Sequence, residues 1–177
     1  MKSSPKHAAV YIPPPLIGII IFLFSLGIQS HFPVSRDHFH NIFIRITGWI
    51  FIGAAMFFGG SGVFRFFKTK NTVETFKPAS SLQTSGIYTI SRNPMYAGLV
   101  SLYIGLAFII ENGWTVILTP LFIFILQTYV IRREEYYLTH AFGEPYLIYK
   151  NSVRRWLGRK KKGFPHRRMR KAGKQYP

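Results

Sequence analysis

Long uncharged apolar segments alternate with short polar segments along the chain. Four segments lack Asp, Glu, Lys and Arg and consist mainly of aliphatic and aromatic residues: Pro15–Gln29, Ile46–Phe64, Met95–Ile110 and Trp114–Ile131. A helix needs about 20 apolar residues to cross the hydrocarbon core of a bilayer. The first segment is short, but Tyr11 and Ile12 can extend it at the interface. The pattern predicts an all-α fold, a polytopic bundle of about four transmembrane helices.

The third and fourth apolar segments are separated only by the tripeptide Glu-Asn-Gly at 111–113. So short and polar a break predicts a tight helical hairpin, with Trp114 at the membrane interface. Small residues let helix backbones approach closely in lipid. We therefore expect the second segment, which is rich in glycine, to pack inside the bundle. Gly98 and Gly105 predict close packing for the third segment as well.

Basic residues are concentrated outside the apolar segments. The 177 residues, enough for one domain, are 48% hydrophobic and carry a formal net charge of +17. Of the 23 Lys and Arg, 14 follow Ile131 and five lie in 65–92. Four spans place both termini and these two basic blocks on one membrane face. The positive-inside rule then predicts that this face is cytoplasmic.

The C-terminal end is polybasic from Arg154 to Lys174. We expect a membrane-embedded domain over residues 1–157 and a flexible basic tail over 158–177. Such a run is either a solvated, partly disordered face or a segment that attracts anionic lipid headgroups. The bilayer and its anionic lipids are thus expected partners. No recognised fold or stacking pattern accompanies the charge, so no nucleic acid is expected.

Metal and thiol chemistry find little support in the sequence. The chain has no cysteine, which excludes a thiolate nucleophile, a disulfide and a Cys-based metal site. Asp37, His38 and His40 stand close together, but they lie in the loop predicted to face away from the cytoplasm. Alternate residues in an exposed loop are more often solvated than ligating. We therefore expect no metal.

Two polar clusters border the predicted hairpin. Arg92–Tyr96 precedes it and Glu134–Glu135 follows it, so the hairpin returns both to the same membrane face. The chain has only six carboxylates, and a carboxylate beside lipid is costly unless it is paired or ligating. The glutamates can be balanced by Arg132, Arg133 or Arg92 in an interfacial ion-pair network. Alternatively, they can bind a ligand.

Two stretches carry a family resemblance. GIYTISRNPMYAG at 86–98, followed by REEYYLTHAFGEPYLIY at 133–149, resembles the isoprenylcysteine carboxyl methyltransferase and phospholipid N-methyltransferase superfamily of integral membrane methyltransferases. Its pattern is G-x-Y, then R-[HN]-P-x-Y-x-G, then a helical hairpin, then E-E-x-x-L-x-x-x-F-G-x-x-Y-x-x-Y. The resemblance covers about Ser80 to Trp156, and both halves occur in the expected order.

The resemblance implies transfer of a methyl group from S-adenosylmethionine to a lipid-like or membrane-embedded acceptor. We assign catalytic roles to Arg92 and Glu134. The implied cofactor-binding residues are Ser80, Ser81, Leu82, Gln83, Tyr88, Asn93, Pro94, Met95, Tyr96, Glu134 and Glu135. A carboxylate suits the cofactor's ribose diol or ammonium, an arginine suits its carboxylate, and a tyrosine face suits its sulfonium. We expect a cofactor-sized hollow at the lipid border between the two polar clusters.

Two other functions stay open at this point. Membrane reductases that use NADPH share a related scaffold with an R-x-P-x-Y-like element, although this chain is much shorter. A non-catalytic membrane adaptor could use the basic tail to recruit lipids or partners. The sequence does not identify the methyl acceptor. A phospholipid amine, a prenylcysteine carboxylate and a small thiol all fit a groove that opens to lipid.

Overall fold

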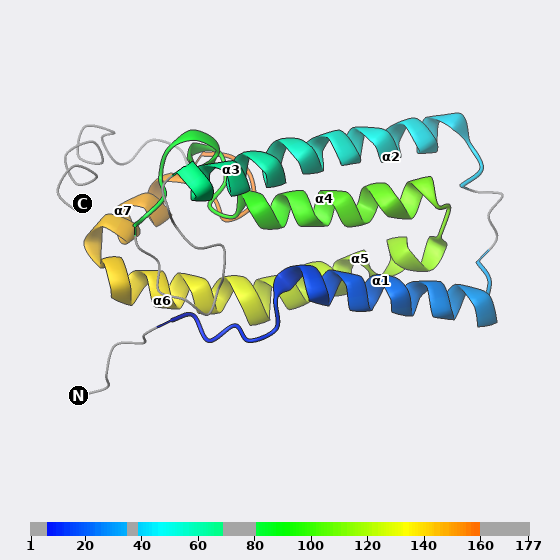
Figure 1. Ribbon diagram of the computed structural model, residues 1–177, viewed down its shortest axis with the longest axis horizontal. Helices are drawn as coiled ribbons and strands as arrows, with labels where there is room; N and C mark the ends of the chain where they lie inside the picture. Colours follow the sequence, from blue (N-terminus) through cyan, green and yellow to red (C-terminus); the bar gives the residue numbers. More distant parts are fainter. Residues whose placement is uncertain (1–6, 35–38, 69–80, 160–177) are drawn as a thin grey trace. The chain divides into compact units, whose positions relative to one another are not determined.

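The computed structural model describes residues 7–34, 39–68 and 81–159, and the regular structure of these residues is almost entirely helical. The helices are α1 (Pro14–His31), α2 (Ile42–Ala55), the π-helix η1 (Met56–Gly60), α3 (Ser61–Lys68), the 3-10 helix η2 (Gly86–Thr89), α4 (Pro94–Ile109), α5 (Gly113–Ile125), the π-helix η3 (Leu126–Ile131), α6 (Arg132–Phe142) and α7 (Glu144–Ser152) (Figure 1). In this part of the chain the β-structure is limited to one isolated bridge, between Val153 and Arg159. The predicted all-α class is confirmed.

Three helices are long and apolar enough to cross a membrane: Pro14–His31, Ile42–Arg65 and Gly113–Phe142. The fourth predicted span corresponds to α4, which is apolar but has only 16 residues. At a rise of about 1.5 Å per residue, α4 measures about 24 Å, which is less than the roughly 30 Å of hydrocarbon. The bundle therefore combines three full-length spans with one shorter apolar helix.

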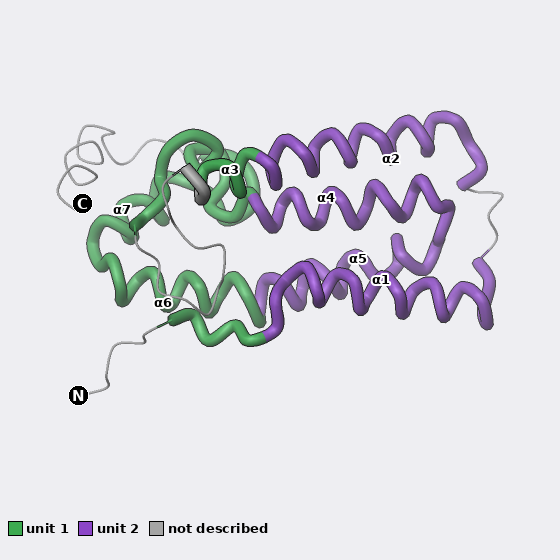
Figure 2. Tube along the Cα trace, in the orientation of Figure 1, with its two compact units in different colours: residues 1–11, 61–94, 129–177 green, residues 12–60, 95–128 purple. Residues whose placement is uncertain are grey.

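The chain divides into two compact units (Figure 2). Unit 1 comprises residues 1–11, 61–94 and 129–177, and unit 2 comprises residues 12–60 and 95–128. Unit 2 contains most of the apolar helices. Unit 1 contains α3, η2, α6 and α7, together with nearly all of the polar motifs. Unit 2 therefore supplies most of the membrane scaffold, and unit 1 supplies most of the residues whose side chains could bind a ligand or take part in a reaction.

Inside unit 2, α1 packs against α5 (Figure 1). Ser25 and Thr115 are fully buried and their hydroxyl oxygens are hydrogen-bonded at 2.7 Å. The ring of Phe122, also fully buried, lies against Gly18, where an added Cβ would come within 3.1 Å of it. The two hydroxyl groups satisfy each other's hydrogen-bonding needs, which lipid tails could not do because they contain no donors or acceptors.

Glycines bring α4 into direct contact with the α2–η1 helix. A Cβ added to Gly98 would lie 2.5 Å from the nitrogen of Gly59 and 2.6 Å from its Cα, and Gly105 makes a similar approach to Gly48. The predicted close packing of Gly98 and Gly105 is therefore confirmed. The expectation that the second segment lies inside the bundle is wrong, because only 6% of its span is buried. Its glycines form one narrow contact and the rest faces outward.

The turn at 110–112 forms the predicted hairpin. The Asn112 side chain caps α5 by accepting a hydrogen bond from the Thr115 backbone N–H at 3.1 Å. Its own backbone N–H donates to the Ala107 carbonyl at 3.0 Å. Trp114 Nε1 donates to the Phe32 carbonyl at 2.6 Å, which fastens the start of α5 to the end of α1. A capped helix start explains why three residues suffice for the reversal.

We predict that Gly98→Ala destabilises the protein by about 1–3 kcal/mol, because the new Cβ would collide with backbone that cannot move aside. The measurement is thermal unfolding of the purified chain in detergent. Gly53→Ala is the matched control, since a Cβ there meets no described atom within 4 Å. That control should be neutral, or stabilising by up to about 1 kcal/mol through helix propensity. Equal melting temperatures for the two variants would contradict the contact.

Candidate functional site

Glu135 lies at the centre of a group of cations in unit 1. Its side chain is only 7% exposed. Arg155 donates to both carboxylate oxygens, from Nε to Oε1 and from Nη2 to Oε2, each at 2.8 Å. Arg92 Nη1 lies 3.1 Å from Oε1, and Lys150 Nζ lies 3.6 Å from Oε2. These four residues form what we call the ion-pair cluster, in which three positive charges meet one negative charge.

Separate parts of the chain contribute to the ion-pair cluster. Glu135 lies in the first turn of α6, Lys150 in the last turn of α7, and Arg92 between η2 and α4. The break between α6 and α7 depends on Gly143, whose φ of +57° is a conformation that residues with a Cβ rarely adopt. Pro145 then occupies the first turn of α7, where its missing N–H costs nothing.

The segment after α7 is fastened to the residues before α4. Arg92 donates its backbone N–H to the Arg154 carbonyl at 3.1 Å, and Gly158 donates to the Ile90 carbonyl at 2.8 Å. The Asn93 side chain donates to the Arg155 carbonyl at 2.9 Å. These bonds hold the Arg155 backbone in place, so its guanidinium reaches Glu135 from a fixed position. The bond to Glu135 also raises the pKa of Arg155.

Three buried tyrosines surround the ion-pair cluster. Tyr149 donates its hydroxyl to the Tyr88 carbonyl at 2.8 Å, which docks α7 against η2. The Tyr146 hydroxyl accepts a bond from Arg92 Nη1 at 3.4 Å. Burial raises the pKa of each of these phenols well above the ordinary value. They therefore stay protonated, and they keep water away from the ion pairs.

The two adjacent glutamates have different surroundings. Glu135 is buried among cations, whereas Glu134 is half-buried. Burial is the main cause of the raised pKa of Tyr88, and the negative charge of Glu134 raises it further. The same charge also contributes to the raised pKa of Tyr146. Glu134 therefore lies close enough to Tyr88 and Tyr146 for its charge to affect both phenols. The sequence left open whether the glutamates join an ion-pair network or bind a ligand, and for Glu135 the structure shows the ion-pair network.

The predicted cofactor segment forms a small polar network with α3. Gln83 donates to the Ser81 hydroxyl at 2.9 Å and accepts from Arg65 Nε at 3.4 Å, while a second Arg65 nitrogen donates to the Ser85 hydroxyl. Leu82 is half-buried beside them. The segment is thus held in a defined conformation. Its contact with a cofactor stays a prediction.

The remaining predicted site residues lie around the start of α4. Asn93 and Pro94 are buried in unit 1, and Asn93 uses its amide to hold Arg155. Met95 is half-buried and Tyr96 is 7% exposed, and both belong to unit 2. The predicted approach of Arg92 to the glutamates is confirmed for Glu135. A cofactor-sized hollow between them stays a prediction.

Some predictions fall outside the described residues. These are Ser80, the loop residues Asp37 and His38, and the tail from residue 160 onward. His40, from the same loop, lies 3.2 Å from a carboxylate oxygen of Glu111. Among the described residues, no group of three or more His, Asp or Glu could hold a metal ion.

The ion-pair cluster contains two residues that the sequence analysis missed. Lys150 has no part in either predicted polar cluster, and Arg155 lies in the polybasic run from Arg154, for which the sequence left a solvated face and a headgroup-binding segment open. In the structure Arg154, Arg155 and Gly158 are all bonded to the site. Arg132 and Arg133 do not balance the glutamates within the described part of the chain. The sequence did contain one signal for such a cluster. The chain has many arginines and only six acids, so a buried acid can be expected to attract several cations.

Comparisons with known proteins agree with the motifs. Residues 43–145 match the profile of the family described as Phospholipid methyltransferase. Protein-S-isoprenylcysteine O-methyltransferase A of Arabidopsis thaliana is 29% identical over 150 residues, which cover 84% of this chain and 72% of that protein. An uncharacterized protein of Haemophilus influenzae is 35% identical over 63 residues, which cover 36% of this chain and 100% of that protein. No solved structure matches.

We predict that Glu135→Gln destabilises the folded protein by about 3–5 kcal/mol, because it leaves the buried guanidinium of Arg92 and the half-buried one of Arg155 without their carboxylate. Thermal unfolding in detergent measures this effect. Glu144→Gln is the matched control, since Glu144 is exposed at the start of α7. It should change stability by no more than about 0.5 kcal/mol. Similar losses in both variants would mean that the ion-pair cluster does not hold unit 1 together.

Proposed function

The chain belongs to the phospholipid methyltransferase family, and on that basis we propose that it transfers a methyl group from S-adenosylmethionine to a lipid-like or membrane-embedded acceptor. It is an integral membrane protein of the isoprenylcysteine and phospholipid methyltransferase type. The observation that carries the proposal is the contact between Arg92 and Glu135. It joins the two halves of the methyltransferase signature in one place.

The residues present fit S-adenosylmethionine. In the ion-pair cluster, one carboxylate leaves three cations with an excess of positive charge, which suits the carboxylate of the cofactor's amino acid group. Arg92 Nε is buried and has no hydrogen-bond partner among the described residues, so this donor is available to such a group. We assign the cofactor's ammonium or ribose diol to Glu134, whose carboxylate has the chemistry that suits either group.

When bound, S-adenosylmethionine supplies a methyl group that is already activated on a sulfonium. The protein's task is then to bind, orient and exclude water. We assign carboxylate binding to Arg92 and Arg155, and a positioning role to Glu135, which fixes both guanidinium groups. Tyr88 and Tyr146 are protonated and buried, so they limit the access of water to this region.

We propose that both termini and this site lie on the cytoplasmic side. The supporting observation is the distribution of charge, since 14 of the 23 Lys and Arg follow Ile131. On that side a water-soluble cofactor can reach unit 1, while an apolar acceptor reaches it from the bilayer. Anionic lipids are the partners we propose for the basic tail.

We predict that S-adenosylhomocysteine raises the melting temperature of the wild-type protein in detergent. Glu134→Gln should weaken this binding about tenfold, which is the effect of losing a hydrogen bond to a charged group. The melting temperature of the variant without ligand is measured beside it, so that a change in folding is separated from a change in binding. Glu144→Gln should bind normally. Stabilisation by NADPH in place of S-adenosylhomocysteine would favour a membrane reductase and refute the proposal.

The acceptor is tested by incubating the protein with S-adenosylmethionine labelled on the methyl group and a total membrane extract. We predict that label enters the lipid fraction, because the family match is to phospholipid methyltransferases. Glu135→Gln protein provides the background. Label confined to the protein fraction would exclude a lipid acceptor and point to a modified protein residue.

A further inference from the structure

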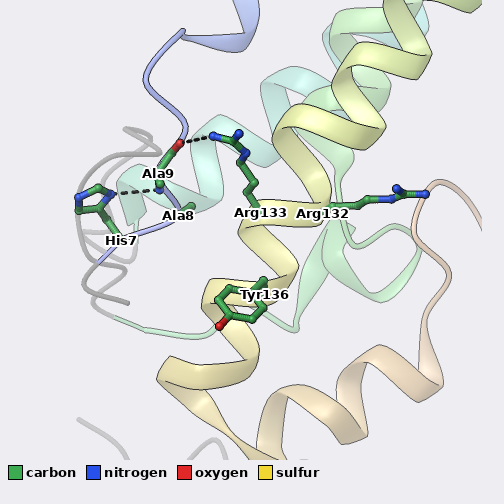
Figure 3. Close-up of a pocket in the computed structure, with 6 residues that line it drawn as sticks. All are labelled: His7, Ala8, Ala9, Arg132, Arg133 and Tyr136. Carbon is green, nitrogen blue, oxygen red and sulfur yellow. Dashed lines mark hydrogen bonds between the residues drawn. The ribbon is translucent and has the colours of Figure 1, made fainter. Parts of the chain in front are cut away.

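A hollow lies on unit 1 between the N-terminal segment and α6. Its volume is about 290 Å³, and its lining residues are His7, Ala8, Ala9, Arg132, Arg133 and Tyr136 (Figure 3). The hollow lies on a different side of α6 from Glu135, since residues 132, 133 and 136 lie within about 100° of one another around the helix axis and Glu135 lies outside that arc. It is therefore separate from the ion-pair cluster.

Arg133 is held in place beside this hollow. Its Nη1 donates to the Ala9 carbonyl at 2.8 Å, and its guanidinium carbon lies 4.5 Å from the centre of the Tyr129 ring. The N-terminal segment that accepts this bond is itself fixed, because Val10 is fully buried and Ala8 is 7% exposed. A guanidinium has five N–H donors, and the bond to Ala9 uses only one of them. Most of its donors are thus available to a ligand.

Among the described residues, no acid neutralises the positive charge at the hollow. In the part of the chain that the structure describes, neither Arg132 nor Arg133 forms an ion pair. Figure 3 shows the two side chains diverging, with Arg133 directed to Ala9 and Arg132 directed away from it. Arg133 therefore offers the direct contact, and Arg132 adds positive charge nearby. The alanine methyl groups and the arginine stems leave the wall largely apolar.

We infer from the sequence of α6 that the hollow lies at the edge of the hydrocarbon core, at the level of the lipid headgroups. Arg132 and Arg133 are the first charges after the uncharged run 114–131, within a candidate span of 30 residues. About 20 residues are enough to cross the hydrocarbon, so the arginines mark the level where the helix enters the headgroups. Tyr136 is 58% exposed and Tyr11 on the N-terminal segment is 69% exposed, as expected of interfacial aromatic residues.

From these observations we propose that the hollow binds the phosphate of an anionic glycerophospholipid. Arg133 holds the phosphate oxygens, because a guanidinium fork matches them in geometry as well as in charge. Arg132 strengthens the attraction, and the apolar wall contacts the glycerol end of the lipid. The bound lipid in turn fastens the N-terminal segment to α6. This inference does not depend on methyl transfer.

The test measures binding of phosphatidylglycerol to the purified full-length protein in neutral detergent by native mass spectrometry. We expect the wild-type protein to bind it and Arg133→Gln to bind about fivefold more weakly or worse, the effect of one interfacial cation. Arg132→Gln should also weaken binding. Because that variant keeps the bond from Arg133 to Ala9, its loss cannot be ascribed to a displaced N-terminal segment.

Arg159→Gln is the matched control, since Arg159 is exposed and does not line the hollow. It should bind phosphatidylglycerol as the wild type does, which separates the hollow from general attraction to the basic chain. Diacylglycerol, which lacks the phosphate, should not compete. Equal binding by the wild type and all three variants, or effective competition by diacylglycerol, would overturn the proposal. Competition by glycerol 3-phosphate at the same concentration would show a site for soluble anions and overturn it too.

Discussion

The burial of one carboxylate governs the organisation of unit 1. An acid that is 7% exposed beside a bilayer costs several kcal/mol unless cations surround it, and Glu135 obtains three. Those cations come from the residue before Asn93, from the end of α7 and from the segment beyond it. Each of these parts has to converge on α6 for the charge to be tolerated. The hydrogen bonds between residues 90–93 and 154–158 follow from that requirement.

The ion-pair cluster contains more positive than negative charge. This excess links its role in stability to its proposed role in ligand binding. A balanced pair would have no reason to attract a further charge. Here three cations share one acid, so the same interaction that holds the fold leaves positive charge for an anionic group. Glu134, its neighbour, escapes this arrangement because successive residues on a helix point about 100° apart. Glu135 serves the structure, and Glu134 is the acid that we assign to the ligand.

Apolar pattern and topology predict much of this protein. The apolar segments, the hairpin at 111–113, the close approach of Gly98 and the meeting of Arg92 with Glu135 all follow from them. Arg155 could not be identified in this way, since it stands in a run of basic residues with the same local composition as its neighbours. Only the three-dimensional course of the chain beyond α7 decides which arginine reaches Glu135. The outward face of the second span was also missed, because lipid-facing and buried helices are equally apolar.

The π-helical turn η3 reconciles two demands on one long helix. Phe122 before it and Leu126 at its first position have to be buried among apolar side chains, and both are fully buried. After it, Glu135 has to meet its cations while Arg133 stays on another side. A π-turn accommodates one residue more than an α-turn, so the side chains beyond it shift around the axis by about 100°. Within α6 itself, residues two positions apart point about 160° from one another, so Glu135 can meet its cations while Arg133 faces away from them.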